Sequence, residues 1–340
     1  MTGVVYKVSD FYLVYAGEDS EIMMDGELRA VGAAGEALQE LAEEDLIPLP
    51  PGSDLLLLPG RLPIGLDVET ERPMVIEEEV TSVAAILPQG YTRFFLPAYQ
   101  RTPNAPQLPL FGYTAVAAGE DGLYVAAGRT DRTENWDPRS YNTPELPRLI
   151  KERLHRYPEN RILRQLAKCA KEYHCQTAQN IFYQRGEGGI PASPSCNARC
   201  LGCISLQPAE CCPSPQGRIN FQPTVEEIVK IALLHLEGEN RVISFGQGCE
   251  GEPLMAEEIL SEAVRRIRAR TKRGTINVNT NAGMPDALKR LIAAGLDSAR
   301  VSLFSANPHN YLLYHRPRGF TLEEVARSID LLGAEGVFIS

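Results

Sequence analysis

The sequence predicts an α/β fold for the second half of the chain, with a small, mainly β domain before it. From residue 204 onward, short apolar runs alternate with segments of helical spacing. Repeated βα units of this kind form a parallel sheet with right-handed crossovers. Residues 1–117 contain β-rich runs separated by turn residues. Residues 118–189 combine a polar stretch with two helical patterns, so we expect a linker and a helical connector there.

The N-terminal domain, residues 1–117, is expected to be a scaffold or an interaction domain, because its sequence offers no recognisable catalytic combination. Ser9 and Asp10 form a turn signal between its first two predicted strands. A helix is predicted over residues 32–44, where Leu38 and Leu41 share one face. The strands predicted in this part of the chain and just after it are residues 4–8, 11–15, 80–87, 91–96, 113–116 and 123–127.

The connector carries two of the cysteines toward the second half of the chain. Its second predicted helix contains Cys169 and ends near His174 and Cys175. The first ends before Pro158, which cannot continue a helix. The predicted elements are a linker over residues 130–142, helices over 146–156 and 159–175, and a loop or short strand over 186–194.

The C-terminal region, residues 190–340, alternates predicted helices and strands. Thr224 and Thr321 each begin a helix with a capping box, and Gly295 ends another. His309 and His315 are predicted to be loop residues. The helices are predicted over residues 224–236, 256–270, 285–294 and 321–334, and the strands over 242–245, 275–279, 299–303 and 337–340.

Composition narrows the class of protein. The net charge of −10 disfavours a broad nucleic-acid footprint. The N-terminus lacks the pattern of a signal peptide, and no apolar run approaches the roughly 20 residues of a membrane-spanning helix. We therefore expect a cytoplasmic protein. All eight cysteines fall between Cys169 and Cys249, which in a cytosolic chain indicates metal or redox chemistry rather than disulfides.

Three cysteines, Cys196, Cys200 and Cys203, have the spacing C-x₃-C-x₂-C. Three thiolates can bind three irons of a cubane cluster and leave the fourth iron open to a small molecule, whereas a closed cluster uses four. Gly202 allows the backbone to wrap closely around such a cluster, and Arg199 could screen its charge. The alternative is a zinc site formed by Cys200, Cys203 and the Cys211–Cys212 pair, although adjacent cysteines chelate one tetrahedral ion poorly.

Residues suited to ligand binding follow the later strands. In βα folds, ligands bind at the carboxyl ends of the strands. The second strand leads into a glycine-rich turn, the third ends in side-chain amides and a hydroxyl, and the fourth is followed by serines and arginines. The candidate cofactor-binding residues are Gly248, Glu250, Gly251, Glu252, Pro253, Asn279, Thr280, Asn281, Ser302, Ser305 and Arg316.

The cysteine motif together with these strand ends resembles the radical S-adenosylmethionine (SAM) superfamily. Residues 250–253 resemble its GGEP motif, with Glu250 where glycine is usual. Residues 280–283 resemble its TNG strand end with Ala282 interposed, and residues 302–305 its SLDS-like run. The resemblance implies a partial TIM barrel and a [4Fe-4S] cluster on Cys196, Cys200 and Cys203. It further implies reductive cleavage of SAM to a 5′-deoxyadenosyl radical that abstracts hydrogen from a substrate.

Several expectations stay open at this point. The substrate is unassigned, with a peptide, protein or small molecule ahead of tRNA, and ferredoxin or flavodoxin is the expected electron donor. Cys249 is a candidate hydrogen-atom donor. Cys169, Cys175, Cys211 and Cys212 are candidates for an auxiliary cluster. The barrel is expected to be truncated after about four βα units, since a closed barrel needs roughly 250 residues. A non-catalytic zinc or iron–sulfur module, or an electron carrier, is the alternative function.

Overall fold

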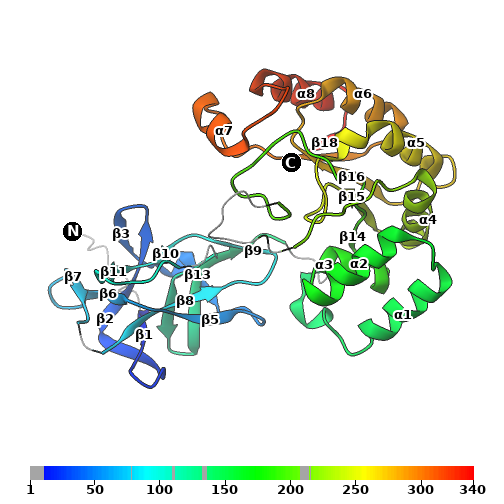
Figure 1. The fold of residues 1–340 in the computed structure, drawn as a ribbon. Coiled ribbons are helices and arrows are strands. Elements are labelled where there is room, and N and C mark those ends of the chain that lie inside the picture. Colours follow the sequence, from blue (N-terminus) through cyan, green and yellow to red (C-terminus); the bar gives the residue numbers. More distant parts are fainter. Residues whose placement is uncertain (1–10, 78, 109–111, 132–135, 207–213, 215) are drawn as a thin grey trace, which may run out of the picture. The chain divides into compact units, whose positions relative to one another are not determined.

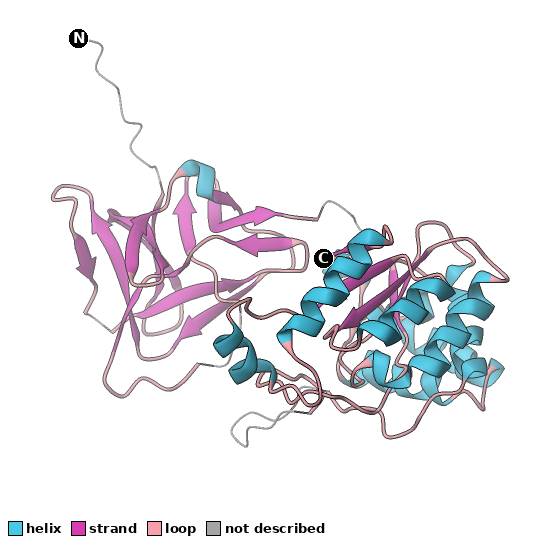
Figure 2. Cartoon of the chain, turned by 90° about the horizontal axis from the view of Figure 1, so that it is seen from above, coloured by secondary structure: helices cyan, strands magenta, loops and turns pink. Residues whose placement is uncertain are grey.

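The computed structural model describes residues 11–77, 79–108, 112–131, 136–206, 214 and 216–340 (Figure 1). The chain divides into two compact units, one ending at Ser140 and the other beginning at Tyr141. Figure 2 shows that strands dominate the first unit and that the second combines helices with strands. The predicted strand over residues 4–8 lies outside the described residues. Within the described residues, none of the helices has the length and apolar character needed to span a membrane.

The first unit is an antiparallel β structure. Its main path runs β11-β6-β2-β1-β12-β13-β4. Val14, Val83, Val116 and Val125 are among the buried residues of its core. The strands are β1 (Tyr12–Ala16), β2 (Ile22–Ala34), β3 (Ala37–Glu40), β4 (Leu46–Pro48), β5 (Asp54–Leu58), β6 (Arg61–Asp67), β7 (Pro73–Val75), β8 (Thr81–Ile86), β9 (Tyr91–Arg93), β10 (Leu96–Pro97), β11 (Tyr99–Arg101), β12 (Val116–Gly119) and β13 (Gly122–Arg129).

The helix predicted over residues 32–44 is wrong. β2 runs through this segment as far as Ala34 and turns at Gly35, which has a positive φ of 65°, into β3. A short 3₁₀ turn over Glu43–Asp45 is the helical part of the segment. Leu41 is fully buried, whereas Leu38 is 41% exposed. The spacing of these two leucines therefore did not mark one apolar helix face, because successive residues of an extended chain face opposite sides and residues three apart do not share a side.

The boundary between the parts also differs from the predicted one. The expected N-terminal domain ended at residue 117, which lies within β12. β12 pairs with β1, and β13 pairs with both β4 and β9. Because of this strand pairing, the β12–β13 hairpin belongs to the first unit, which ends at Ser140.

The second unit contains a parallel sheet with the order β14-β15-β16-β17-β18, and helices α4, α5, α6 and α8 pack side by side along it (Figure 1). This is an α/β fold of the partial-barrel type. The strands are β14 (Glu187–Gly189), β15 (Val242–Phe245), β16 (Thr275–Thr280), β17 (Ser298–Val301) and β18 (Phe338–Ile339). The helices are α1 (Leu146–Arg156), α2 (Arg161–Glu172), α3 (Gln176–Tyr183), α4 (Val225–Leu236), α5 (Glu257–Arg268), α6 (Pro285–Ala294), α7 (Pro308–His315) and α8 (Leu322–Ala334).

The local signals in the sequence account for most of these helices. The capping boxes at Thr224 and Thr321 are formed, and Gly295 ends α6 with a left-handed φ of 113°. The predicted helices over residues 146–156 and 285–294 are confirmed with the same bounds. The sequence analysis missed α3 and α7, which are short and whose apolar residues lack a clear period.

The two faces of the parallel sheet differ in polarity. Ile243, Phe245, Ile276, Val278 and Ala299 are fully buried and pack with the helices in one core. Because successive side chains of a strand alternate between faces, the residues between them point to the opposite face. Those residues are polar, and they form part of the candidate site described below.

His235 of α4 is expected to make the stability of the second unit depend on pH. Its Nε2 lies 3.1 Å from the carbonyl oxygen of Gly186, and Nδ1 is buried and has no partner among the described residues. Burial lowers the pKa of His235 to about 4. The ordinary pKa of histidine is about 6.5. Between pH 4 and 6.5, the unfolded chain therefore binds one more proton than the folded chain. Stability is fully present above pH 6.5 and falls by up to about 3 kcal/mol as the pH drops to about 4.

Urea unfolding at a series of pH values checks this prediction. His235→Gln keeps a donor for Gly186 but cannot titrate, so the difference between wild type and variant should shrink as the pH falls from 7 to 4. His155→Gln, at an exposed position of α1, is the matched control. Parallel pH profiles for wild type and His235→Gln would contradict the prediction.

Candidate functional site

The three cysteines of the C-x₃-C-x₂-C motif lie on one loop that follows β14. The end of α7 holds this loop through backbone hydrogen bonds. The amide of Arg199 donates to the carbonyl oxygen of His315 over 3.0 Å, and that of Leu201 donates to Tyr314 over 2.9 Å. A Cβ at Gly202 would collide with the Tyr314 hydroxyl, so a larger residue there would displace this side chain of α7.

Hydrogen-bond donors surround the sulfur atoms of the motif. Cys200 Sγ lies 3.4 Å from Nδ1 of His315. Cys203 Sγ accepts from the amide of Leu206 over 3.3 Å and from the guanidinium of Arg218 over 3.5 Å. Arg218 thus contacts a sulfur of the motif, whereas the side chain of Arg199 is exposed and its predicted screening role stays a prediction.

The thiols of the motif influence one another electrostatically. Burial raises the pKa of Cys196 and raises that of Cys200 to about 11, with further increases at Cys200 from Cys196 and Cys203. Burial acts in the same direction on Cys203, but hydrogen bonds from Ser205 and Leu206 outweigh it and lower the pKa of Cys203. Cations at this site would favour all three thiolates.

The three cysteines supply the thiolate donors that an iron–sulfur cluster uses. These cysteines are free thiols. In the part of the chain that the structure describes, no three His, Cys, Asp or Glu side chains are close enough to bind one metal ion. Thiolates that each bind a different iron of a cubane do not need that proximity. Cys211 and Cys212, invoked for the zinc alternative, lie outside the described residues.

Glu250 has a structural function in the loop after β15. Its Oε2 accepts from the amides of Ala192 and Ser193 over 2.6 and 3.0 Å. Its Oε1 accepts from the amides of Gly246 and Gln247 over 2.6 and 3.1 Å. Burial raises the pKa of Glu250 to about 7, against the effect of these four donors. The carboxylate therefore joins the segment before the cysteine loop to the glycine-rich turn.

Glu252 joins the same turn to the end of β16. Its Oε1 accepts from the Thr280 hydroxyl over 2.6 Å and from the amide of Leu254 over 3.1 Å, and its Oε2 accepts from the amide of Asn281 over 2.8 Å. Asn281 in turn donates to the side-chain oxygen of Asn197 in the cysteine motif over 2.6 Å. The predicted second and third strand ends are thus hydrogen-bonded to each other and to the cysteine loop.

The backbone also brings these segments together. The amides of Gly251 and Glu252 donate over 2.8 Å to the carbonyl oxygens of Ser193 and Ser195, respectively. A Cβ at Gly251 would collide with the carbonyl oxygen of Ser195, immediately before Cys196. Pro253 is buried and begins a 3₁₀ turn. The EGEP segment therefore packs directly on the chain that leads into the cysteines.

The remaining candidate residues lie around this junction without forming one cluster. Asn279 donates to the carbonyl oxygen of Gly246 over 3.3 Å. Ser302 is exposed, and its amide donates to the carbonyl oxygen of Thr280 over 2.9 Å. Ser305 accepts from the amide of Asn307. Arg316 is exposed and ends α7 with a left-handed φ of 48°. Gly248 is partly buried and leaves no room for a Cβ beside Gln216.

Cys249, the candidate hydrogen-atom donor, is buried in the hydrophobic core together with Cys169 of α2. A hydrogen bond with Cys169, followed by burial, raises the pKa of Cys249 well above its ordinary value. Cys175 is partly buried nearby, 3.3 Å from the Thr177 hydroxyl. This core placement gives no support to a catalytic Cys249, and an auxiliary cluster on Cys169 and Cys175 stays a prediction.

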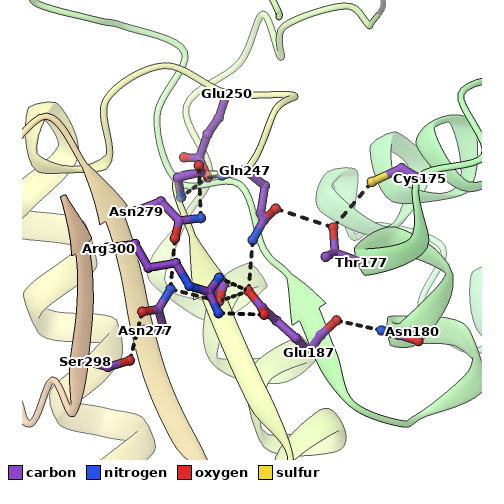
Figure 3. Close-up of polar contacts among 12 residues, drawn as sticks. Cys175, Thr177, Asn180, Glu187, Gln247, Glu250, Asn277, Asn279, Ser298 and Arg300 are labelled. Carbon is purple, nitrogen blue, oxygen red and sulfur yellow. Dashed lines mark hydrogen bonds and ion pairs between the residues drawn. The ribbon is translucent and has the colours of Figure 1, made fainter. Parts of the chain in front are cut away.

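A polar network covers the face of the sheet opposite the helices (Figure 3). Glu187 of β14 accepts from both terminal nitrogens of Arg300 of β17, over 2.6 and 2.9 Å. It also accepts from Ser244 over 2.5 Å and from Gln247 over 3.4 Å, and Ser244 is linked to Asn277. Two strands separate β14 from β17, a span of about 14 Å in a flat sheet. The bidentate ion pair therefore requires this face to be concave.

Comparison with known families decides the class of the second unit. Residues 190–340 match the family model described as the radical SAM superfamily. These residues form a radical SAM domain. The match supports SAM-dependent enzyme chemistry and the iron–sulfur cluster that this family uses. No curated protein matches the chain.

Two solved structures are similar to part of the chain. "Native anSMEcpe with bound AdoMet" is 18% identical, with a TM-score of 0.36, over 46% of this chain and 43% of that protein. A histidine-tagged form of anSMEcpe, also with bound AdoMet, is 20% identical, with a TM-score of 0.32, over 45% of this chain and 42% of that protein. The chain thus spans less than half the length of these structures.

The radical SAM domain and the strand just before it contain site residues that the sequence analysis did not single out. They are Glu187, Arg218, Arg300 and the buried His315. The prediction that His309 and His315 are loop residues is wrong, because both lie in α7, where His315 is the last residue and only 2% exposed. The Asn307-Pro308 pair was an available signal, since asparagine at the N-cap and proline at the first helical position mark a helix start.

Proposed function

We propose that the radical SAM domain carries a [4Fe-4S] cluster on Cys196, Cys200 and Cys203 and cleaves SAM reductively. When bound, the cluster supplies an electron to SAM, giving methionine and a 5′-deoxyadenosyl radical that abstracts hydrogen from the substrate. The observation that carries the proposal is the junction of the cysteine loop with the turn after β15 and the end of β16. Asn197, Glu252 and Asn281 connect these three segments by side-chain hydrogen bonds.

The residues of the chain have distinct tasks in this proposal. Glu250 and Glu252 are fully engaged with protein groups, so we assign them to shaping the turn rather than to direct SAM binding. The backbone of residues 248–253 and the side chain of Asn279 are left to contact SAM. Ser302, Ser305 and Arg316 are candidates for its ribose or carboxylate. An external donor such as ferredoxin or flavodoxin would reduce the cluster.

Anaerobic reconstitution tests the proposal. Purified protein is incubated with iron, sulfide and reductant, and bound iron and acid-labile sulfide are measured. SAM and dithionite are then added, and 5′-deoxyadenosine and methionine are quantified. We expect about four irons at the cysteine loop and formation of both products. Stoichiometric zinc without SAM cleavage would instead favour the non-catalytic binding module.

The polar network supports a polar substrate. Inward-facing residues of barrel strands are ordinarily branched and apolar. Burying polar groups costs free energy unless they are hydrogen-bonded. On this concave face, Glu187 is only 9% exposed, whereas the Arg300 side chain is 48% exposed. We infer that the half-exposed guanidinium of Arg300 faces a substrate with anionic or amide groups, such as a peptide.

Replacement of Arg300 by methionine tests this inference. Burial would raise the pKa of Glu187, but hydrogen bonds from Arg300 and Ser244 lower it overall. Without the arginine we expect substrate-dependent formation of 5′-deoxyadenosine to fall at least tenfold, with substrate-independent SAM cleavage nearly unchanged. Arg290→Met, which removes a largely exposed partner of Glu257, is the control. An equal loss in both assays, or an apolar substrate found by deuterium transfer, would contradict the inference.

A further inference from the structure

His315 contacts Cys200 from the end of α7, and both nitrogens of its ring have a neighbour. Nδ1 lies 3.4 Å from Cys200 Sγ. Nε2 lies 3.2 Å from the backbone nitrogen of Phe304. A peptide N–H can only donate, so Nε2 must be the unprotonated, accepting nitrogen. The neutral ring then carries its hydrogen on Nδ1. His315 therefore directs an N–H group at the sulfur of Cys200.

The position of this donor is fixed on several sides. The ring of His315 lies 4.5 Å from that of Tyr311 and 5.0 Å from that of Tyr314, measured between centroids. Its own carbonyl oxygen accepts from the amide of Arg199, inside the cysteine motif. Backbone and side chain of one residue thus contact the same loop, which holds the imidazole in place before any cofactor binds.

We propose that His315 donates a hydrogen bond to the iron-ligating sulfur of Cys200 and thereby raises the reduction potential of the cluster. This inference rests on the proposed function. Hydrogen bonds to the sulfur atoms are among the factors that set the potential of an iron–sulfur cluster. Reduction adds negative charge to the cluster and its thiolates, so an N–H donor stabilises the reduced form more than the oxidised form.

The hydrogen bond to Cys200 differs in kind from those that Cys203 receives. Cys203 receives its hydrogen bonds from a backbone amide and from the cationic Arg218. Cys200 receives one from a neutral, buried side chain on a helix that lies far along the chain. A donor at Cys200 makes the cluster easier for an external protein to reduce and a weaker reductant toward SAM. His315 is therefore a positioning and tuning residue, and it does not itself touch the reacting atoms of SAM.

Two amide substitutions test the contributions of the two ring nitrogens of His315 separately. His315→Gln places a carbonyl oxygen near Nε2, which can still accept from Phe304, but it removes the donor near Nδ1. His315→Asn places an amide nitrogen near Nδ1, which can still donate to Cys200, but it removes the acceptor. His309→Asn, at an exposed position in the first turn of α7, is the matched control.

The readout is the midpoint potential of the reconstituted cluster, measured by a redox titration followed by electron paramagnetic resonance. We expect His315→Gln to lower the reduction equilibrium constant about tenfold, which for one electron is about 59 mV. His315→Asn and His309→Asn should stay close to wild type. An unchanged potential in His315→Gln would overturn the proposal, as would equal shifts in the Gln and Asn variants, which would indicate a role through Phe304 or packing alone.

A measurement on wild type covers the case in which the variants do not assemble a cluster. With ¹⁵N-labelled histidine, pulsed electron paramagnetic resonance of the reduced cluster should detect a nitrogen coupling. Its absence would overturn the proposal. If wild type assembles no cluster or does not cleave SAM, the proposed function fails. If it does both and the His315 results are negative, only the present inference fails.

Discussion

Replacing Cys200 by alanine is expected to abolish both the visible iron–sulfur absorption and the cleavage of SAM. Cys196 and Cys203 would remain, but two thiolates cannot hold a cubane that leaves a single iron open. The protein should still fold, because the loop is also held by backbone hydrogen bonds from Arg199 and Leu201 to α7. Iron and sulfide content, the visible spectrum and 5′-deoxyadenosine formation are the measurements.

Cys175→Ala is the matched control for this experiment. Cys175 is a free cysteine in the same unit but lies outside the motif. Its replacement should leave the cleavage of SAM and the iron bound by the three-cysteine motif intact. Full iron content and activity in Cys200→Ala would be incompatible with the proposed function. A loss of the iron of a second cluster in Cys175→Ala would support the predicted auxiliary cluster.

Replacing Glu250 by glutamine is expected to destabilise the radical SAM domain by about 2–6 kcal/mol. Each carboxylate oxygen of Glu250 accepts from two backbone amides. An amide group in its place would turn one oxygen into a donor facing two N–H groups, and an unsatisfied buried donor costs about 1–3 kcal/mol. This is a large part of the typical stability of a domain, about 5–15 kcal/mol. The midpoint of urea unfolding is the direct measurement.

Glu262→Gln provides the comparison for Glu250→Gln. Glu262 lies on the outer side of α5 and pairs with the solvent-exposed Arg265 and Arg266. Exposed ion pairs contribute little to stability, about 0–1 kcal/mol, so this change should move the unfolding midpoint only slightly. Equal midpoints for the two variants would show that the four amides around Glu250 find other partners.

Local sequence signals predicted most helices and strands of the second unit well. The capping boxes, Gly295 and the short apolar runs placed α4, α6, α8 and the parallel strands close to their observed bounds. The glycine-rich turn and the asparagine-rich strand end were also recognised as candidate ligand-binding segments. These features succeed because caps, turns and strand ends depend on residues close together in the chain.

Other features depend on contacts that no local pattern encodes. The role of Glu250 as an acceptor of four amides follows from where the chain brings residues 192, 193, 246 and 247 together. Glu187 and Arg300 were overlooked because they meet only when the sheet curves. The hairpin of β2 and β3 was mistaken for a helix because two leucines three residues apart suggest one helix face, and the pairing of β3 with β2 has no local signal.

The attachment of the cysteine loop to α7 has a consequence for biosynthesis. Cys200 and His315 are separated by 115 positions in the chain, and the carbonyl oxygens that hold Arg199 and Leu201 come from the same late segment. These contacts cannot form until the later segment has been synthesised, and contacts between distant parts of a chain form slowly because a long loop must be closed. During translation the thiols are therefore exposed well before the loop reaches its final shape. If the three cysteines carry the proposed cluster, its iron would therefore be bound in the final geometry only after α7 has folded against the loop.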